Sequence, residues 1–197
     1  MGAQLQFWFD LASTYSYLSA MRIEHAASSK KVKVAWQPFL LGPIFAEQGW
    51  NNSPFNLYPA KGRYMWRDME RLCDERDLPL QRPGTFPANS LKAARLCLAM
   101  PSHVERAKFV RTVFEAEFGS GRDISNNAVL TDCLIAAGAS AELMGRTRDE
   151  DVKAALFEQV ARAKSLGIFG APSFVVGEEL FWGDDRLDAA ISYAASI

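Results

Sequence analysis

The stretch of sequence that decides the fold lies near the start of the chain, where residues 5–18 read LQFWFDLASTYSYL. Its first part is an apolar run that ends at Asp10, which is typical of a short buried strand. From Ser13 onward apolar residues recur at helical spacing, and the hydroxyl of Ser13 or Thr14 suits the N-cap of a helix. Residues 4–28 are therefore predicted to form a strand, a tight turn and a helix.

The remaining chain predicts an α/β domain whose mixed sheet is interrupted by a large all-helical insertion. A second strand is expected at residues 32–39, and the Gly, Pro and Asn residues of segment 40–58 indicate an irregular connection with one helical turn. Two short strands, 173–176 and 180–182, and a last helix from Asp184 follow the helical block. The helices expected within that block span residues 62–77, 91–100, 102–118 (with Pro101 at its first position), 127–137 and 149–166.

Composition excludes several classes of protein. The chain has 197 residues, of which 49% are hydrophobic and 23% charged, so it can build a substantial core and is not disordered. A net charge of -1 offers no general attraction for nucleic acid or anionic lipid. No apolar segment is long enough for a membrane span, and no signal peptide is recognisable, so we expect a cytoplasmic protein without membrane or nucleic-acid partners.

The three cysteines, Cys73, Cys97 and Cys133, contain no C-x-x-C motif and form no cluster with histidine. Such spacing indicates neither a disulfide framework nor a metal site, so no bound metal is expected.

Two motifs add a family resemblance. Residues 9–18, FDLASTYSYL, resemble the F-D-x-x-S-P-Y-S-Y-L opening of 2-hydroxychromene-2-carboxylate isomerases and kappa-class glutathione transferases. Near the other end, GAPSFVVG (170–177) and FWGDDRL (181–187) resemble the G-V-P-T-F and F/W-W/F-G-N-D-R-L segments of the same families, and PAKGRYM (59–65) and FPAN (86–89) are also similar. The resemblance covers essentially the whole chain.

This resemblance implies a thioredoxin-like fold of the DsbA and kappa type. Residues 1–60 and 167–197 are then expected to form the thioredoxin-like domain, and residues 61–166 the inserted helical domain. Pro172 resembles a proline that is usually cis in such folds, although an ordinary trans turn is the alternative.

Ser13 is the predicted catalytic residue. Disulfide-exchanging proteins of this fold carry C-x-x-C at this turn, where a helix N-terminus lowers the pKa of a thiol, whereas this chain has Ser13 and Ser16. The resemblance implies that Ser13 instead donates a hydrogen bond to the thiolate of bound glutathione. From the residues alone, the simpler interpretation of Ser13 as only an N-cap is favoured, and the family motif reverses that preference.

The resemblance also implies the other residues that hold the glutathione cofactor. The backbone of Ala171 is expected to pair with the cysteinyl part, Lys61 to pair with a carboxylate, and the turn Trp182 to Asp185 to hold the γ-glutamyl end. The expected cofactor-binding residues are Ser13, Asn52, Lys61, Ala171, Trp182, Gly183, Asp184 and Asp185, and Asn89 is expected to line the substrate pocket. Without the resemblance, Lys61 is a solvated lysine, and Asn89, Asp184 and Asp185 are helix caps.

The activity implied is that of a glutathione-dependent isomerase acting on a small aromatic acid, as a homodimer. One departure affects the binding of a carboxylate, of the substrate or of glutathione. The isomerases carry a lysine where this chain reads Ile44-Phe45-Ala46, so the carboxylate lacks that partner here. A kappa-like glutathione transferase and a non-catalytic thioredoxin-like binding module remain the alternatives.

Overall fold

The computed structural model describes residues 4–197 and contains a four-stranded sheet in the order β2-β1-β3-β4. The strands are β1 (Gln4–Phe9), β2 (Lys33–Pro38), β3 (Ser173–Val176) and β4 (Glu179–Trp182). β1 and β2 are parallel, whereas β3 runs antiparallel to both β1 and β4. The mixed sheet interrupted by helices that the sequence predicts is confirmed.

The central strand β1 is apolar because both of its faces are buried. Phe7 is fully buried and faces its register partners Trp36 on β2 and Phe174 on β3. The ring of Phe7 lies 5.1 Å from the ring of Trp36 and 5.5 Å from that of Phe174. Such cross-strand aromatic pairs fix the register of the sheet. Trp8 buries its ring on the opposite face.

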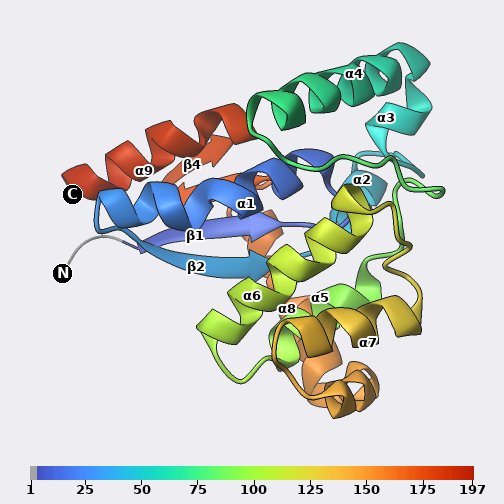
Figure 1. Ribbon diagram of the computed structural model, residues 1–197. Helices are drawn as coiled ribbons and strands as arrows, with labels where there is room; N and C mark the ends of the chain where they lie inside the picture. The colour runs from blue at the N-terminus through green and yellow to red at the C-terminus, as the bar shows by residue number, and fades with distance from the viewer. Residues whose placement is uncertain (1–3) are drawn as a thin grey trace.

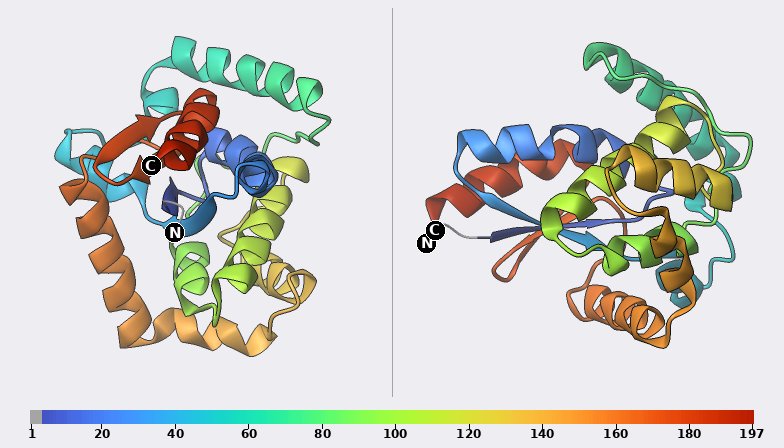
Figure 2. Two further views of the ribbon diagram at one scale, coloured as in Figure 1. Left: turned by 90° about the vertical axis from the view of Figure 1, so that its left-hand side faces the viewer. Right: turned by 60° about the horizontal axis from the view of Figure 1, so that its bottom comes forward.

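Helices cover both faces of the sheet. On one face, α1 (Thr14–Ser29) and α9 (Leu187–Ser196) lie side by side (Figure 1). On the other face, α8 (Glu150–Ser165) and α2 (Leu41–Glu47) contribute Ala163 and Ile44 to a cluster around Trp8. Figure 2 shows α8, in orange, on the side of the sheet away from α9.

Between β2 and β3 the described chain forms only helices, turns and loops. Besides α2 and α8, the α-helices of this segment are α3 (Pro54–Leu57), α4 (Pro59–Glu75), α5 (Leu91–Ala99), α6 (His103–Phe114) and α7 (Asn127–Ala136). Within residues 4–197, no helix is both long and apolar enough to cross a membrane.

The structure corrects the predicted helices in three places. Segment 40–58 holds two short helices, α2 and α3, instead of one helical turn. Ser102 caps α6 by accepting a hydrogen bond from the backbone N–H of Glu105 at 3.2 Å, so Pro101 precedes that helix and is not its first residue. A 3₁₀ segment, Ala141–Arg148, follows α7 and has no clear helical periodicity in the sequence.

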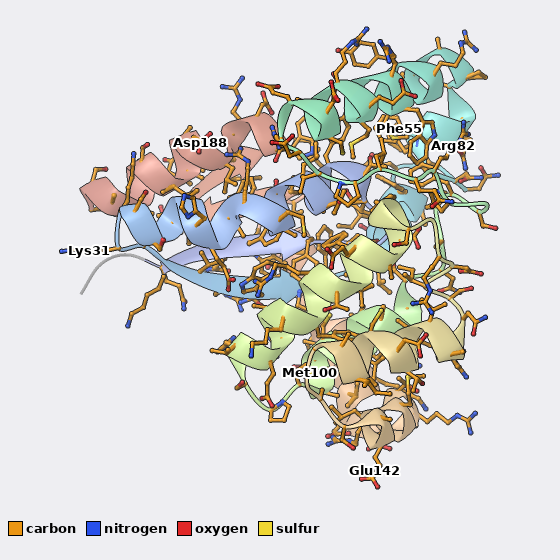
Figure 3. All side chains as sticks on the ribbon, in the orientation of Figure 1. Lys31, Phe55, Arg82, Met100, Glu142 and Asp188 are labelled. Atoms are coloured by element: carbon orange, nitrogen blue, oxygen red, sulfur yellow. The ribbon has the colours of Figure 1, made fainter. Side chains whose placement is uncertain are left out.

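The hydrophobic core joins the sheet to the inserted helices. One continuous cluster contains Phe7 of β1, Leu18 of α1, Phe109 of α6 and Leu130 of α7. The helical segment extends across the molecule: in Figure 3, Glu142 of the 3₁₀ segment and Phe55 of α3 are labelled on opposite sides. The division into 1–60 with 167–197 and 61–166 stays a prediction about chain organisation, and its first three residues lie outside the described residues.

The end of α6 buries a carboxyl group. After Phe114 the helix widens into a π-helical segment, Glu115–Gly119, in which Glu117 is fully buried. One carboxyl oxygen of Glu117 accepts a hydrogen bond from the backbone N–H of Ile124 at 3.4 Å, and the other has no hydrogen-bond partner among the described residues. Burial raises the pKa of Glu117 to about 8, so at neutral pH the folded protein holds this group protonated.

Because the pKa of Glu117 is raised in the folded protein, we expect stability to fall as the pH rises. The unfolded chain releases this proton near the ordinary glutamate pKa, whereas the folded protein keeps it up to about pH 8. Across the interval between the two pKa values, Glu117 should lower the free energy of unfolding by about 1.4 kcal/mol per pH unit. Glu117→Gln should remove this slope and gain more stability at pH 8 than at pH 5 in urea unfolding.

Glu115→Gln is the matched control, since Glu115 is exposed two residues earlier in the same segment. An equal gain at both pH values, or the same change for both variants, would contradict the assignment.

Candidate active site

A single large pocket lies where the topology brings several chain segments to one end of the sheet. Its volume is about 1570 Å³, and it opens where β1, β2 and β4 end and β3 begins. The walls come from the turn after β1, from α2 to α4, and from the segments 86–91, 169–172 and 182–186. Such a pocket exceeds the size usual for one small ligand, so it has room for two.

Asp10 connects several segments of the pocket wall through hydrogen bonds to its buried carboxyl group. Its side chain is buried, and one oxygen accepts hydrogen bonds from the Ala12 N–H at 3.0 Å and the Ser90 hydroxyl at 2.7 Å. The other oxygen accepts the N–H of Leu41, the first residue of α2, at 2.8 Å. Burial raises the pKa of Asp10, and these three hydrogen bonds oppose the rise. The carboxyl group thus joins the turn before α1 to α2 and to the start of α5.

Ser13 lies at the N-cap of α1, as the sequence predicts. Its hydroxyl oxygen accepts a hydrogen bond from the Ser16 N–H at 3.3 Å, and the hydroxyl donates to the carbonyl oxygen of Ala171 at 3.1 Å. No acidic residue belongs to the first turn of α1, so no side chain of that turn offsets the partial positive charge of the helix N-terminus. Ser13 can therefore cap the helix and also interact with a negatively charged atom in the pocket.

The Ala171-Pro172 peptide bond is cis, in agreement with the prediction for Pro172. The carbonyl of Ala171 faces the Ser13 hydroxyl, and both residues line the pocket. A second cis bond, Phe86-Pro87, precedes Asn89 and was not predicted.

The turn after β4 contributes an aromatic wall and a glycine with positive φ. The ring of Trp182 packs on that of Phe169 with centroids 4.8 Å apart, and a Cβ atom on Gly170 would overlap the Trp182 indole. Gly183 has φ +106, which only glycine adopts readily, and its N–H donates to the carbonyl of Pro172 at 3.0 Å. These contacts hold the turn against the Ala171-Pro172 loop.

Asp184 and Asp185 differ in their surroundings. Asp184 is buried, and its carboxylate accepts hydrogen bonds from Ser19 at 2.8 Å and Arg76 at 2.7 Å, with Arg22 at 3.6 Å. All of these partners belong to the protein, so the carboxylate of Asp184 is already occupied. The side chain of Asp185 is 72% exposed and lies next to Arg186 at 3.3 Å. Of the two aspartates, Asp185 is the one available to a ligand.

Asn52, Lys61 and Asn89 lie on the helical side of the pocket. The side-chain oxygen of Asn52 accepts hydrogen bonds from the Ser53 N–H and the Asn56 amide, and that of Asn89 accepts the Leu91 N–H at 3.1 Å. The Lys61 ammonium lies 5.0 Å from the centre of the Tyr58 ring. Every residue predicted for the site lines this one pocket: Ser13, Asn52, Lys61, Asn89, Ala171, Trp182, Gly183, Asp184 and Asp185.

Several pocket residues are not predicted by the sequence. Aromatic side chains of α2, α3 and the adjoining loops form much of the wall, including the Phe45 and Trp50 pair, whose ring centroids are 5.6 Å apart. Tyr15 and Asp68 also line the pocket and are hydrogen-bonded to each other. The motif contains Tyr15, but nothing in its spacing distinguishes a core tyrosine from a pocket tyrosine.

The cysteines lie away from the pocket. All three are buried without a disulfide, and none belongs to the pocket lining. Burial raises the pKa of Cys73 and Cys133 to about 11 and that of Cys97 to about 12. These thiols are therefore protonated and weakly nucleophilic at neutral pH. Among the described residues, no group of three or more His, Cys, Asp or Glu side chains is placed to hold a metal ion.

Comparison with known proteins identifies the family. The model of the DSBA-like thioredoxin domain matches residues 4–193, so the chain belongs to that family. The thioredoxin-like fold of the DsbA type predicted from the sequence is thereby confirmed.

The chain is also similar to named enzymes. It is 27% identical over 195 residues to 2-hydroxychromene-2-carboxylate isomerase from Sphingobium xenophagum, covering 98% of each chain. It is 24% identical over 198 residues to glutathione S-transferase kappa 1 from Caenorhabditis elegans, covering 93% of this chain and 87% of the relative. A solved 2-hydroxychromene-2-carboxylate isomerase superposes with a TM-score of 0.88 at 22% identity, covering 98% of this chain and 95% of the other. These similarities confirm the prediction that the protein is an enzyme of the isomerase class.

The Asp10 cluster gives a prediction about stability. Asp10→Asn replaces one hydrogen-bond acceptor with a donor, so the backbone N–H of either Leu41 or Ala12 loses its acceptor, whereas the Ser90 hydroxyl can turn to accept. We expect the free energy of unfolding to fall by about 1–3 kcal/mol in urea titrations, the cost of a buried unsatisfied polar group.

Ser90→Ala removes only one donor to Asp10 and is the matched comparison. Its cost should be smaller, about 1 kcal/mol. If Asp10→Asn costs no more than Ser90→Ala, then the carboxyl group does not act as the common acceptor.

Proposed function

We propose that this protein is a glutathione-dependent isomerase of the 2-hydroxychromene-2-carboxylate type, which acts on a small aromatic acid. The observation that carries this proposal is the Ser13 hydroxyl at the N-terminus of α1, in a pocket whose described lining includes no cysteine. The names of the relatives support it, because they combine an isomerase with a glutathione transferase.

The residues present are compatible with glutathione. Ser13 and the helix N-terminus provide a hydroxyl and partial positive charge for a thiolate, and Ala171 lines the same pocket with its carbonyl bonded to Ser13. Lys61 has no carboxylate partner among the described residues, so its ammonium is available to a ligand carboxylate. Exposed Asp185 supplies the opposite charge for an ammonium group.

These residues divide the binding task in the proposed complex. Ser13 donates to the sulfur, Ala171 pairs through its backbone with the cysteinyl part, and Lys61 pairs with a carboxylate. Trp182, Gly183 and Asp185 hold the γ-glutamyl end, while Asp184 positions the turn through Arg22 and Arg76. Asn52 acts from the loop before α3, where its oxygen already orders Ser53 and Asn56.

When bound, glutathione supplies a thiolate that adds to a conjugated carbon and leaves after bond rotation. Ser13 must then turn its hydroxyl proton from Ala171 toward the sulfur, which exchanges one hydrogen bond for a charge-assisted one. The N–H groups at the start of α1 keep the negative charge in place throughout, since they are fixed by the helix.

The second substrate is assigned to the apolar part of the pocket. Asn89 and the aromatic side chains Phe45, Trp50 and Phe55 line this region. Ala46 also lines it, at the position for which the isomerases resembled here carry lysine, so the acid group of the substrate must find its partner elsewhere. Lys61 is already assigned to glutathione, and Arg76 is paired with Asp184. Arg186 is therefore the remaining cation of the described lining for this acid group.

Ser13→Ala tests the proposal. Calorimetry should show that the wild-type protein binds glutathione, and absorbance of the bound thiolate should give a lowered thiol pKa. The variant should raise that bound-thiol pKa by about one unit, the equivalent of one charge-assisted hydrogen bond, and slow isomerisation of the chromene acid by about tenfold at neutral pH.

Ser13→Thr keeps the hydroxyl and the helix cap, so it should retain most of the pKa shift. If neither the wild-type protein nor the variant binds glutathione, the binding-module alternative is favoured. If glutathione binds but the chromene acid is not interconverted with its ring-opened partner, then the isomerase proposal fails.

The kappa-like transferase is the second candidate, favoured by the large apolar pocket and by Ala46 in its wall. The two activities differ in their thiol balance. An isomerase should leave the free thiol concentration constant during turnover, whereas a transferase should consume one thiol for each product, which thiol titration of the reaction mixture measures directly.

The resemblance also implies a homodimer, which we propose together with a cytoplasmic location. Light scattering of the purified protein during gel filtration tests the dimer.

A further inference from the structure

Tyr15 and Asp68 form a hydrogen-bonded pair on the pocket wall beside Ser13. Tyr15 lies in the first turn of α1, only two residues after Ser13, and Asp68 projects from α4. The Tyr15 hydroxyl donates to a carboxylate oxygen of Asp68 at 2.9 Å, and both residues line the pocket. Figure 3 shows Phe55, whose ring lies 6.3 Å from that of Tyr15, on the side of the molecule where α3 and α4 lie.

Because Tyr15 donates in this hydrogen bond, its oxygen can still accept one from another group. An ionised carboxylate only accepts hydrogen bonds, so the phenolic proton of Tyr15 is committed to Asp68. The oxygen of Tyr15 keeps its lone pairs and can accept a hydrogen bond from a second group. Because the hydroxyl is polarised by the charged partner, it is a stronger acceptor than an isolated phenol.

Tyr15 is also held in its neutral form. Burial, together with the hydrogen bond and the charge of Asp68, raises the pKa of Tyr15 above its usual value. Ring contact with Phe55 limits where the phenol can point. The pocket wall therefore presents a fixed, neutral acceptor in the first turn of α1, two residues after Ser13.

We propose that Tyr15, oriented by Asp68, accepts a hydrogen bond from a hydroxyl group of the second substrate and so selects hydroxylated aromatic compounds. Aromatic pairs on the wall, Phe45 with Trp50 and Phe169 with Trp182, suit a flat ring. Tyr15 contacts the substrate directly, whereas Asp68 is a positioning residue that acts through Tyr15. This inference rests on the proposed function, since the ring must reach the sulfur held near Ser13.

Three kinds of glutathione conjugate provide the test: S-benzylglutathione, its hydroxybenzyl analogues with the hydroxyl at each ring position, and the matching methoxybenzyl analogues. Calorimetry should show that the wild-type protein binds at least one hydroxybenzyl conjugate about tenfold more tightly than S-benzylglutathione, the worth of one hydrogen bond. The methoxy analogue should show no such gain, because a methoxy group cannot donate a proton.

Two variants locate the effect. Tyr15→Phe should abolish the preference, so that this variant binds the hydroxybenzyl conjugate and S-benzylglutathione with equal affinity. Asp68→Ala should narrow the discrimination between hydroxyl and methoxy, because Tyr15 is then free to donate as well as to accept. Tyr193→Phe is the matched control, since Tyr193 lies outside the pocket lining and the same change there should alter neither affinity.

The outcomes separate this inference from the proposed function. If glutathione and S-benzylglutathione bind but no hydroxyl preference is found, or if the preference survives Tyr15→Phe, the role of Tyr15 is wrong and the proposed function stands. If neither glutathione nor S-benzylglutathione binds to the wild-type protein, the proposed function fails and the role of Tyr15 fails with it.

Discussion

The pocket depends on the hydrogen bonds made to the buried carboxyl group of Asp10. Its oxygens accept hydrogen bonds from the turn before α1, from the first residue of α2 and from Ser90 before α5. A buried carboxyl group without donors is costly, so these segments must meet in this arrangement for the folded state to be stable. Asp10 thereby fixes the turn that carries Ser13 relative to the inserted helices that supply the opposite wall.

The sequence predicts the parts of the fold that local patterns encode. The apolar run before Asp10, the capping hydroxyl of Ser13 and the helical spacing after it indicate β1 and α1 without any tertiary information. Family motifs then place Ala171 and the turn 182–185 in the same site, and the pocket contains all of these residues. Local signals and motifs are sufficient where a residue acts through backbone geometry.

Features that depend on distant contacts could not be predicted. The pairing of Tyr15 with Asp68 spans α1 and α4, and the burial of Glu117 depends on how the end of α6 packs. Asp184 reads in the sequence as a helix cap, yet its carboxylate is bound by Arg22 of α1 and by Arg76 at the end of α4. In each case the residue type permits several roles, and tertiary packing chooses among them.

The placement of sulfur and hydroxyl groups gives the site its chemical character. The cysteines lie in buried positions where the pKa of each thiol is raised to about 11 or 12, so the protein's own thiols are protonated and weakly nucleophilic at neutral pH. The helix N-terminus, which is the place in this fold best able to stabilise a thiolate, carries Ser13 instead. A serine there cannot exchange disulfides, but it keeps the helix field and adds a hydrogen-bond donor. These properties suit a site that stabilises the thiolate of a ligand, which is why the absence of a cysteine at the turn favours a glutathione-dependent reaction over a disulfide exchange.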